Sequence, residues 1–468
     1  MLVRSGLMND LVIPESCLPL DIARAAQPAW AGAGIGARLR VMATLRRLIA
    51  RDASALAATI DRDPADTLVA EVLPLAEAAA FLVRHARAIL APVAPRGRTP
   101  LWLYGVRALI VRDPCGVVLI LAPGNYPLFL AGAQALQALA AGNAVCVKPA
   151  PGCTAPMRAL AALLTEAGLP VGVFSVLEED AGPAAVTAGF DHIVLTGSAD
   201  TGRRVLATAG LTPCTLELSG ADAMFVLPGA DLALVARCLA YGLRLNGGAT
   251  CIAPRRVFVT TADHAPLRDR LLALLPAVAD ARIPDRTAAQ LRDLVALAVG
   301  QGASAVVVPG RPVVVDDARS DMALLQQDVF APWLALVPVP TMEAALAADR
   351  ACPYALGATV FGPDRAAAAF ARRVHAGSVC VNDVVAPTAD PRLPFTGRGR
   401  SGYGETRGAE GLLRMTVVKT LSQRRGSFRP HLDPPRPDGA RLFGAMVAVL
   451  HGGLPGWLTA FSLLRKRG

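Results

Sequence analysis

The sequence is poor in several kinds of residue, and each scarcity narrows what the chain can do. Aromatic residues make up 5% of the 468 residues, and although the net charge is +10, the one dense basic run is Arg465–Arg467. Nucleic-acid binding usually needs clustered basic residues together with aromatics, so we expect no nucleic-acid partner. The nine cysteines show no C-x-x-C spacing and no His-rich partner run, so we expect no metal site.

Lysine and asparagine are so scarce that each occurrence is informative. Among the 47 basic residues the lysines are Lys148, Lys419 and Lys466. The asparagines are Asn9, Asn125, Asn143, Asn246 and Asn382. A lysine or asparagine that follows an apolar run is therefore a candidate for a specific role.

Long apolar runs are also scarce, so we expect neither a secretory signal nor a membrane-spanning segment. The basic start Met1–Arg4 is followed by polar residues and Pro14 instead of an apolar segment. The apolar stretch Cys115–Val147 is interrupted by Pro, Gly and Asn between 123 and 127, which predicts a buried strand, a loop and a helix. An odd cysteine count favours free thiols in a reducing compartment. We expect a cytoplasmic protein.

Length and hydrophobic pattern predict two or three domains of the α/β class. Apolar runs of strand length alternate with Ala-rich stretches of helical length, in two series. The first series is Gly116–Ala122, Ala144–Lys148, Val171–Leu177, Ile193–Thr196 and Cys214–Leu218. The second is Ala223–Leu227, Arg255–Thr260, Ala303–Val308, Ala358–Phe361 and Ser378–Val381. Such strands imply parallel sheets covered on both faces. Upstream, Ile22–Ala91 predicts helices with breaks near Pro28 and Pro64, and Asp231–Leu245 predicts another helix.

Cys251 stands apart from the other cysteines. It lies in the segment Leu245–Ala253 after a Gly-Gly pair, which lets the backbone approach a ligand, and it follows Glu217 by 34 positions. We interpret it as a nucleophilic thiol with Glu217 as its general base. Four other cysteines sit in apolar, strand-like contexts and are expected to be inert core residues: Cys115, Cys146, Cys214 and Cys380.

Seven short motifs follow one another along the chain: Ala122–Pro127, Val147–Ala150, Leu195–Gly202, Leu216–Gly220, the Cys251 segment, Val329–Pro332 and Pro394–Gly402. Their order and approximate spacing resemble the aldehyde dehydrogenase superfamily, over about residues 20–425. The resemblance implies an α/β fold with a Rossmann-type cofactor domain, an α/β catalytic domain that carries the cysteine, and a small bridging element.

The resemblance also implies domain boundaries. Residues 1–219 would hold the N-terminal helices and the cofactor-binding domain, with bridging strands inserted at about 95–114. Residues 220–400 would form the catalytic domain, and 401–425 would return to the cofactor domain and bridging element. Residues 426–468 would form a Pro/Arg-rich and apolar C-terminal extension.

Three residues match the catalytic positions of the family. Cys251 matches the nucleophile that forms a thiohemiacetal with the aldehyde, and Glu217 matches the base that activates water to hydrolyse the resulting thioester. Asn125 matches the side-chain donor to the oxyanion, together with the Cys251 backbone N–H. Taken alone, Glu217 is equally a surface carboxylate and Asn125 a turn residue. The implied reaction is NAD(P)-dependent oxidation of an aldehyde to a carboxylic acid.

The cofactor residues follow from the same resemblance, because no G-x-G-x-x-G follows a strand. Gly197 and Ser198, after Thr196, form a small-residue turn whose helix start can receive a pyrophosphate. Lys148 matches the ribose-binding lysine, and Asp328 and Phe330 match residues at the nicotinamide end. Three positions after Lys148, the family often has a glutamate that binds the adenosine ribose. Here Pro151 occupies that position, so NADP is as plausible as NAD.

Several positions depart from the family pattern. Ala249 replaces the usual Gln before the nucleophile, Asp328 replaces a Glu, and Thr406 takes a Glu slot, with Glu405 displaced by one residue. Asn382 matches another family position near the substrate. Two alternatives stay open: a coenzyme A-acylating or reductive acyl dehydrogenase, which Glu217 disfavours, and a catalytically degenerate nucleotide-binding paralogue.

The C-terminal segment has two apolar runs, Leu442–Leu450 and Leu454–Leu464, followed by Arg465–Arg467. Each is shorter than the roughly 20 residues of a membrane-spanning helix. The runs either pack on the protein's own core or a dimer partner, or lie at an anionic membrane surface through residues 442–467. Apolar C-terminal extensions occur in some fatty-aldehyde members of the family, which favours a lipophilic aldehyde and peripheral contact at the inner face of the membrane. The family also predicts a homodimer or homotetramer.

Overall fold

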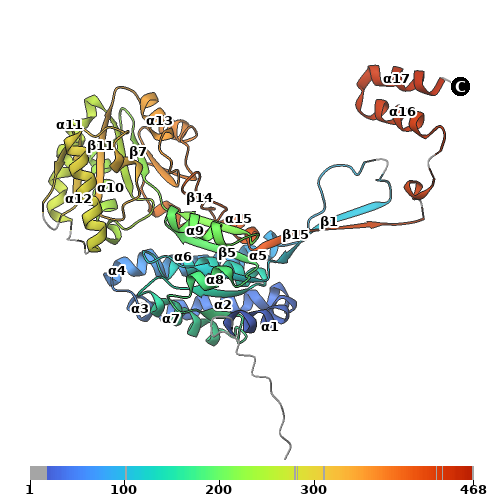
Figure 1. The fold of residues 1–468 in the computed structure, drawn as a ribbon, viewed down its shortest axis with the longest axis horizontal. Coiled ribbons are helices and arrows are strands. Elements are labelled where there is room, and N and C mark those ends of the chain that lie inside the picture. Colours follow the sequence, from blue (N-terminus) through green and yellow to red (C-terminus); the bar gives the residue numbers. More distant parts are fainter. Residues whose placement is uncertain are drawn as a thin grey trace, which may run out of the picture. The chain divides into compact units, whose positions relative to one another are not determined.

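The computed structural model describes residues 18–100, 103–278, 281, 283–308, 311–427, 429–434 and 436–465 (Figure 1). The basic start of the chain and Lys466–Arg467 lie outside the described residues. The chain divides into two units. One combines Met1–Val93 with Val111–Lys419, and the other combines Ala94–Ile110 with Thr420–Gly468.

The first unit opens with helices whose apolar sides face the first sheet. They are α1 (Leu18–Gly32), α2 (Gly34–Arg51), α3 (Ala53–Ala57), α4 (Pro64–Thr67), the π-helical turn η1 (Leu68–Val72) and α5 (Leu73–Ile89). The expected break near Pro64 is confirmed, but the break near Pro28 is wrong, because Pro28 lies inside α1. Packing holds this helix together: Leu20 and Trp30 are buried, and Trp30 Nε1 donates to the Leu139 carbonyl at 3.0 Å.

The first sheet has six strands in the order β14-β6-β5-β2-β3-β4. Its strands are β2 (Val117–Leu121), β3 (Ala144–Lys148), β4 (Phe174–Val176), β5 (His192–Gly197), β6 (Cys214–Leu218) and β14 (Gly402–Tyr403). All pairs are parallel except β14 with β6. The connecting helices are α6 (Phe129–Ala141), α7 (Thr154–Glu166), α8 (Gly182–Thr187) and α9 (Ala199–Thr208).

Alternate residues of these strands enter two separate cores. Val118, Val145 and Val194 pack with the helices α2, α5, α6 and α7 on one face. Leu119, Cys146 and Ile193 pack with α1, α8 and α9 on the other face. A parallel sheet buried on both faces is the arrangement that the near-continuous apolar strands predict.

The second sheet has seven strands in the order β13-β12-β7-β8-β11-β10-β9. They are β7 (Asp222–Val226), β8 (Pro254–Thr260), β9 (Ser304–Val306), β10 (Val313–Asp316), β11 (Trp333–Val339), β12 (Gly357–Phe361) and β13 (Ser378–Val381). The edge strand β9 is antiparallel and the others are parallel. Its α-helices are α10 (Leu232–Arg244), α11 (Thr261–Leu274), α12 (Asp285–Gly300), α13 (Met342–Arg350) and α14 (Asp364–Ala371). Helix α15 (Gly408–Arg414) follows β14 and packs on α5 and α6 of the first sheet.

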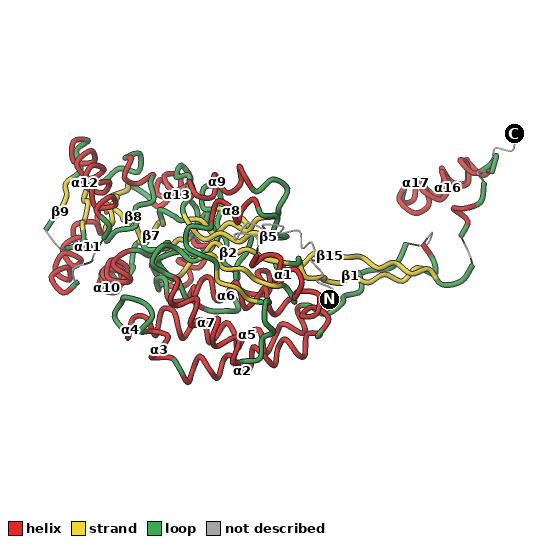
Figure 2. The backbone as a smooth tube through the Cα atoms, turned by 60° about the horizontal axis from the view of Figure 1, so that its bottom comes forward, coloured by secondary structure: helices red, strands yellow, loops and turns green. Residues whose placement is uncertain are grey.

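The second unit contains part of a two-stranded ribbon, whose other part belongs to the first unit, and a helical hairpin. Strands β1 (Val106–Pro114) and β15 (Thr416–Arg424) pair as a two-stranded sheet and run side by side in both views (Figure 2). Helices α16 (Gly439–His451) and α17 (Gly453–Arg465) pack against each other. Among the described residues, every helix is too short or too polar to cross a bilayer.

The expected α/β class, with two mostly parallel sheets, is confirmed. One expectation about the cysteines needs correction. Cys146 and Cys380 are buried, but Cys115 and Cys214 are partly exposed. Cys214 is the first residue of β6 and Cys115 lies in the turn between β1 and β2, where a side chain is less enclosed than in mid-strand.

Candidate active site

Cys251 follows a sharp backbone turn after α10. The turn passes through η3 (Leu245–Gly248), where Asn246, Gly247 and Gly248 have positive φ values of 51°, 57° and 75°. A Cβ on Gly248 would lie 2.5 Å from the Pro332 Cα. The position therefore requires glycine, and the Gly-Gly pair lets the loop of Cys251 pack against the segment at Pro332.

The Cys251 thiol is partly buried between charged groups. Burial raises its pKa well above the usual range, and the carboxyls of Glu217 and Asp222 raise it further, while the Arg407 guanidinium opposes them. Thiolate formation at this cysteine therefore depends on nearby positive charge.

Glu217 lies near the carboxyl end of β6 and is 4% exposed. The Thr406 hydroxyl donates to Glu217 Oε2 at 2.6 Å, and Oε1 has no well-directed hydrogen bond among the described residues. Burial raises the pKa of Glu217 against the opposing effects of Arg407, Thr406 and Gln134. A carboxyl with a raised pKa and one oxygen without a well-directed hydrogen bond suits a general base.

Asn125 lies in the loop between β2 and α6 and its side chain is fixed at both ends. Its Nδ2 donates to the Ala249 carbonyl at 3.1 Å, and its Oδ1 accepts from the Tyr126 N–H at 3.0 Å. An amide nitrogen carries two hydrogens, so one N–H stays available. Asn125 is thus attached to the loop that carries Cys251 and keeps a donor for an oxyanion.

Two cavities meet at Cys251 and Glu217, since both residues line each of them. The first cavity, of about 560 Å³, is mainly apolar, with walls that include Val69, Leu73, Phe129, Leu130, Leu245, Ile252 and Phe395. The second cavity, of about 250 Å³, is lined by Asn125 and by most of the residues predicted to bind cofactor: Thr196, Gly197, Ser198, Asp328 and Phe330.

The turn at Gly197–Ser198 fits a dinucleotide phosphate. Ser198 is extended and its hydroxyl accepts from the Thr201 N–H at the start of α9. One turn later, a Cβ on Gly202 would lie 2.7 Å from Leu218 Cδ1, so glycine allows α9 to pack closely on β6. A small-residue turn, a helix start and a close helix–strand contact are the features with which nucleotide folds receive a pyrophosphate.

Asp328 lines the second cavity, and both Ser219 and Arg255 act on its carboxyl. Burial raises its pKa to about 6, while Ser219 and Arg255 act in the opposite direction. Asn382 lies elsewhere: it caps the end of β12, where its side chain bonds with both the N–H and the carbonyl of Gly362 at 3.0 Å.

Lys148 ends β3, next to Leu121 of β2, and is not among the residues that line the second cavity. Three positions further, the exposed Pro151 supplies no carboxylate. A carboxylate from another strand connection, that of Glu179, is instead hydrogen-bonded to the residues that follow Pro151. Glu179 accepts from the Gly152 N–H at 2.8 Å and from the Thr154 hydroxyl at 2.6 Å. A negative charge therefore lies beside the loop after Lys148, contrary to what Pro151 alone suggests.

The sequence reasoning missed a buried cation in the first cavity. Arg407 is 6% exposed, lies over the Phe395 ring at 4.5 Å, and acts electrostatically on both Glu217 and Cys251. A signal was present, because Arg407 directly follows the unusual Thr406. The sequence reasoning also missed Asn246, whose Nδ2 donates to the backbone carbonyls of Asn125 and Ala249, although the scarcity of asparagine pointed to it.

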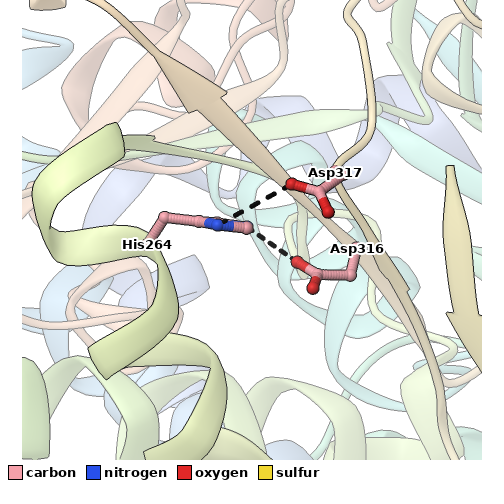
Figure 3. A group of neighbouring side chains, drawn as sticks. All are labelled: His264, Asp316 and Asp317. Carbon is pink, nitrogen blue, oxygen red and sulfur yellow. Dashed lines mark ion pairs between the residues drawn. The ribbon is translucent and has the colours of Figure 1, made fainter.

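One group of metal-ligand type lies away from this site, among the described residues (Figure 3). His264 Nε2 is 2.7 Å from Asp316 Oδ1 and its Nδ1 is 3.8 Å from Asp317 Oδ1. The Arg268 guanidinium lies 3.3 Å from the other Asp316 oxygen. Because Arg268 already supplies positive charge to Asp316, we interpret the group as an ion-pair cluster.

The fold defines the class of NAD(P)-dependent oxidoreductases, and comparison with known proteins is consistent with this class. The model of the aldehyde dehydrogenase family matches residues 19–421. The chain belongs to the aldehyde dehydrogenase family, whose members oxidise aldehydes with NAD or NADP.

Individual relatives span nearly the whole chain. A probable coniferyl aldehyde dehydrogenase from Pseudomonas aeruginosa is 31% identical, over 86% of this chain and 88% of the relative. A 4,4'-diapolycopene aldehyde oxidase from Methylomonas is 29% identical, over 92% and 86%. The crystal structure of an NADP-dependent glyceraldehyde-3-phosphate dehydrogenase from Bacillus halodurans, complexed with NADP, is 26% identical, with a TM-score of 0.81 over 88% of this chain and 91% of that one.

Proposed function

We propose that the chain oxidises a lipophilic aldehyde to a carboxylic acid through a covalent thioester on Cys251. The observation that carries this proposal is the position of Cys251 and Glu217 where the first and second cavities meet. An aldehyde in the first cavity and a nicotinamide in the second would then reach the same thiol from two sides.

The first half of the reaction forms the acyl-enzyme. The Cys251 thiolate attacks the aldehyde carbon, forming a C–S bond and an oxyanion on the former carbonyl oxygen. Asn125 and the Cys251 N–H donate to that oxyanion. When the C–O double bond forms again, the hydrogen leaves the carbon as hydride, and the thiohemiacetal becomes a thioester.

The bound cofactor, NAD or NADP, supplies the acceptor for that hydride. Gly197, Ser198 and the start of α9 would hold its pyrophosphate, Thr196 would border the second cavity beside them, Lys148 would hold its adenosine ribose, and Asp328 and Phe330 would orient its nicotinamide end. These assignments rest on the lining of the second cavity and, for Lys148, on its place at the end of β3.

The second half returns the free enzyme. Glu217 takes a proton from water through its open oxygen, and the hydroxide attacks the thioester carbon. The C–S bond breaks, the carboxylic acid leaves, Cys251 recovers its thiolate, and Glu217 releases the proton to solvent. Coenzyme A would have to enter the same space, whereas the buried Glu217 beside the thiol favours water.

The substrate class follows from the lining of the first cavity. Its walls are mostly aliphatic and aromatic, and two of its charged residues, Asp66 and Arg244, form an ion pair at 2.8 Å. An apolar tunnel gains affinity with each buried methylene, about 0.8 kcal/mol. A relative named for an apolar polyene aldehyde agrees with this class.

An aldehyde panel graded by chain length and aromaticity, run with both cofactors, tests the assignment. We expect kcat/KM to rise with aldehyde length, and Cys251→Ser to keep cofactor binding while losing nearly all oxidation. Oxidation retained by Cys251→Ser would overturn the mechanism. Equal kcat/KM for short and long aldehydes would overturn the substrate class alone.

Membrane contact is supported by the charge and surface of the second unit. Its sequence holds eleven lysines and arginines against two aspartates, a net charge of +9 out of the chain's +10. On α16 and α17, Phe443, Leu454, Trp457 and Leu458 are each more than 60% exposed. Basic charge beside exposed aromatic and aliphatic side chains suits the surface of an anionic bilayer.

Vesicle flotation tests this contact. The full chain should float with vesicles that contain phosphatidylglycerol. With vesicles of pure phosphatidylcholine it should remain unbound at the bottom of the gradient. A chain ending at Asp438, or the full chain with Trp457 and Leu458 replaced by Gln, should lose flotation. Equal flotation of all three proteins would contradict the proposal.

A homodimer or homotetramer is supported by the ribbon of β1 and β15. An isolated two-stranded sheet is marginally stable in water, and Leu109, Val417, Val418 and Leu421 on this ribbon are 43–56% exposed. A second copy of the chain would cover them. Light scattering with size-exclusion chromatography should give an even number of subunits, and a monomer at micromolar concentration would contradict this.

A further inference from the structure

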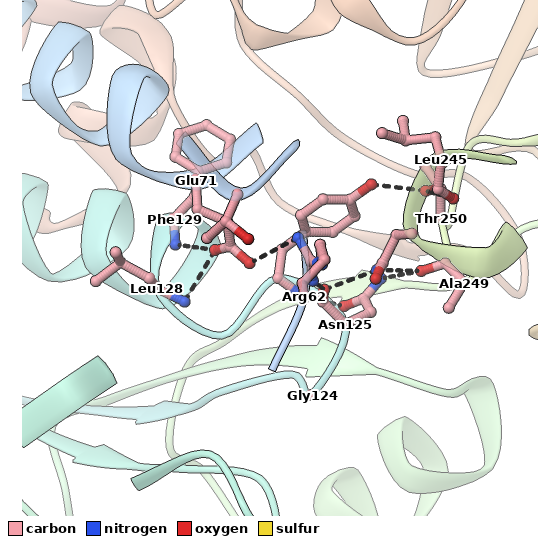
Figure 4. Close-up of polar contacts among 12 residues, drawn as sticks. Arg62, Glu71, Gly124, Asn125, Leu128, Phe129, Leu245, Ala249 and Thr250 are labelled. Carbon is pink, nitrogen blue, oxygen red and sulfur yellow. Dashed lines mark hydrogen bonds and ion pairs between the residues drawn. The ribbon is translucent and has the colours of Figure 1, made fainter. Parts of the chain in front are cut away.

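A buried carboxylate lies beneath the loop that carries Asn125. Glu71 is fully buried and sits in the π-helical turn η1. Its Oε2 accepts from the backbone N–H groups of Leu128 at 3.0 Å and Phe129 at 2.8 Å, at the start of α6. Figure 4 shows Glu71 between these two N–H groups on one side and Arg62 on the other.

Arg62 connects Glu71 to Asn125. Its Nη1 is 3.3 Å from Glu71 Oε1, and its Nη2 donates to the Asn125 carbonyl at 2.6 Å. The guanidinium lies over the Tyr126 ring, 5.2 Å from its centroid. The side chain is 13% exposed, so this cation is largely withdrawn from water and fixed by three neighbours.

The same loop is bonded on its other side to the loop of Cys251. Asn246 Nδ2 donates to the Asn125 carbonyl at 2.8 Å and to the Ala249 carbonyl at 3.2 Å. The Tyr126 hydroxyl is 2.6 Å from Thr250 Oγ1, next to Cys251. Asn125 therefore stands between a buried ion pair and the nucleophile loop.

We propose that Arg62 and Glu71 are positioning residues, which fix Asn125 at the orientation in which its free N–H meets the oxyanion formed at Cys251. Neither side chain is among the residues that line the two cavities, so both act through Asn125 and not on the substrate. The proposal rests on the role of Asn125 in the proposed function.

The cost of this arrangement supports a specific role. A buried ion pair contributes little net stability, because two charges lose their hydration, and apolar residues in its place are often as stable. The fixed guanidinium of Arg62 does, however, orient the Asn125 carbonyl through its hydrogen bond. A π-helical turn also frequently marks a functional site, and Glu71 is presented by such a turn.

A double-mutant cycle on kcat tests the proposal in the full-length enzyme at pH 8.5, where Glu71 is ionised. Asn125→Ala should lower kcat by about 100-fold, as removal of an oxyanion donor does. Arg62→Met should lower kcat by about 10-fold, with KM and the Kd for NAD unchanged, because only the transition state loses a donor. The variant with both changes should be no slower than Asn125→Ala alone.

Further variants separate positioning from folding. Arg62→Lys should recover much of the activity, because an ammonium group can still donate to the Asn125 carbonyl. Glu71→Gln keeps an acceptor for the N–H groups of Leu128 and Phe129 and turns an amide toward Arg62, so it should resemble Arg62→Met. The matched control is Arg51→Met, which removes an exposed arginine that pairs with Glu166; its kcat should equal that of the wild type.

The outcomes distinguish the positioning role of Arg62 and Glu71 from the role of Asn125 at the oxyanion. If Arg62→Met and Asn125→Ala lower kcat independently, so that their effects multiply, the positioning role is wrong while the role of Asn125 stands. If Asn125→Ala leaves kcat unchanged, both are wrong. If Arg62→Met does not fold, Glu71→Gln in combination with Asn125→Ala provides the same comparison.

Discussion

The Thr406 hydroxyl donates a hydrogen bond to the Glu217 carboxylate at 2.6 Å. Thr406 occupies the position where the family pattern has a glutamate, and that substitution makes the proton relay uncertain from sequence alone. In the structure a neutral hydroxyl contacts the base directly and favours its ionised form, since it lowers the pKa that burial raises. A second carboxylate in this buried space would raise that pKa further.

Removal of the Thr406 hydroxyl should leave a smaller fraction of Glu217 ionised at neutral pH. In Thr406→Val the pKa of Glu217 rises, so the acidic limb of kcat should move up by about one pH unit. Thr406→Ser keeps the hydroxyl and should keep the wild-type limb. The pH profile of steady-state turnover checks this, and an unshifted limb in Thr406→Val would show that Thr406 does not act on the base.

Arg407 should control the reactivity of the thiol. Its guanidinium lowers the pKa of Cys251 against burial and the nearby carboxyls. Arg407→Met keeps an apolar side chain beside Phe395 but removes the charge, so alkylation of Cys251 by iodoacetamide at pH 8 should slow by about 10-fold. Arg407→Lys, which retains a charge, should react at a rate close to wild type. Equal rates in the methionine variant would contradict the electrostatic role.

Glu179 should set the preference between the two cofactors. Its bonds to the Thr154 hydroxyl and the Gly152 N–H lower its pKa, so the carboxylate is negative at neutral pH and disfavours a 2′-phosphate nearby. Glu179→Gln should improve NADP binding relative to NAD by about 10-fold. Calorimetric Kd values for both cofactors, without aldehyde, measure the ratio. The neighbouring Glu178→Gln is the control, and an unchanged ratio in Glu179→Gln would exclude this role.

The buried Glu71 should make stability depend on pH. Burial raises its pKa to about 7 from 4.5, against the bonds from Phe129, Leu128 and Arg62. Between these values the folded state holds a proton that the unfolded state has lost, so the stability contribution is complete below pH 4.5 and disappears as pH rises to 7. The change is on the order of 3 kcal/mol. Glu71→Gln lacks this titration, so its melting temperature relative to wild type should rise between pH 5 and 7.5, and a constant difference would contradict the shifted pKa.

Much of the fold could be predicted because strand burial is visible in residue order. The runs at Ala144–Lys148, Cys214–Leu218 and Ser378–Val381 have the same bounds in the structure. Strands β10 and β11 were missed for physical reasons. β10 has four residues, and β11 contains Pro338, which normally argues against a central strand, yet it pairs there with Val259 of β8. The domain boundaries at 219, 400 and 425 remain predictions.

The site could be predicted where one motif places one side chain, and it could not where partners come from distant segments. The scarcity of asparagine singled out Asn125, and its side chain bonds to Ala249 in the loop of Cys251; its role at the oxyanion stays a prediction. Arg62 and Glu71 lie on either side of the expected helix break at Pro64, and no motif marks either one; only folding brings them beneath Asn125. Likewise, Pro151 suggested that no carboxylate lies near the loop after Lys148. Glu179, which accepts from the Gly152 N–H, comes from a different strand connection, so the local sequence does not reveal it.

The most direct test of the central claim is the mass of the Glu217→Gln enzyme after mixing with aldehyde and NAD or NADP. Without the base, the thioester should form and persist. We predict one equivalent of reduced cofactor per active site in a rapid burst, slow turnover afterwards, and an acyl adduct on the peptide that contains Cys251. A burst without an adduct at Cys251, an adduct on another cysteine, or undiminished turnover would contradict the account.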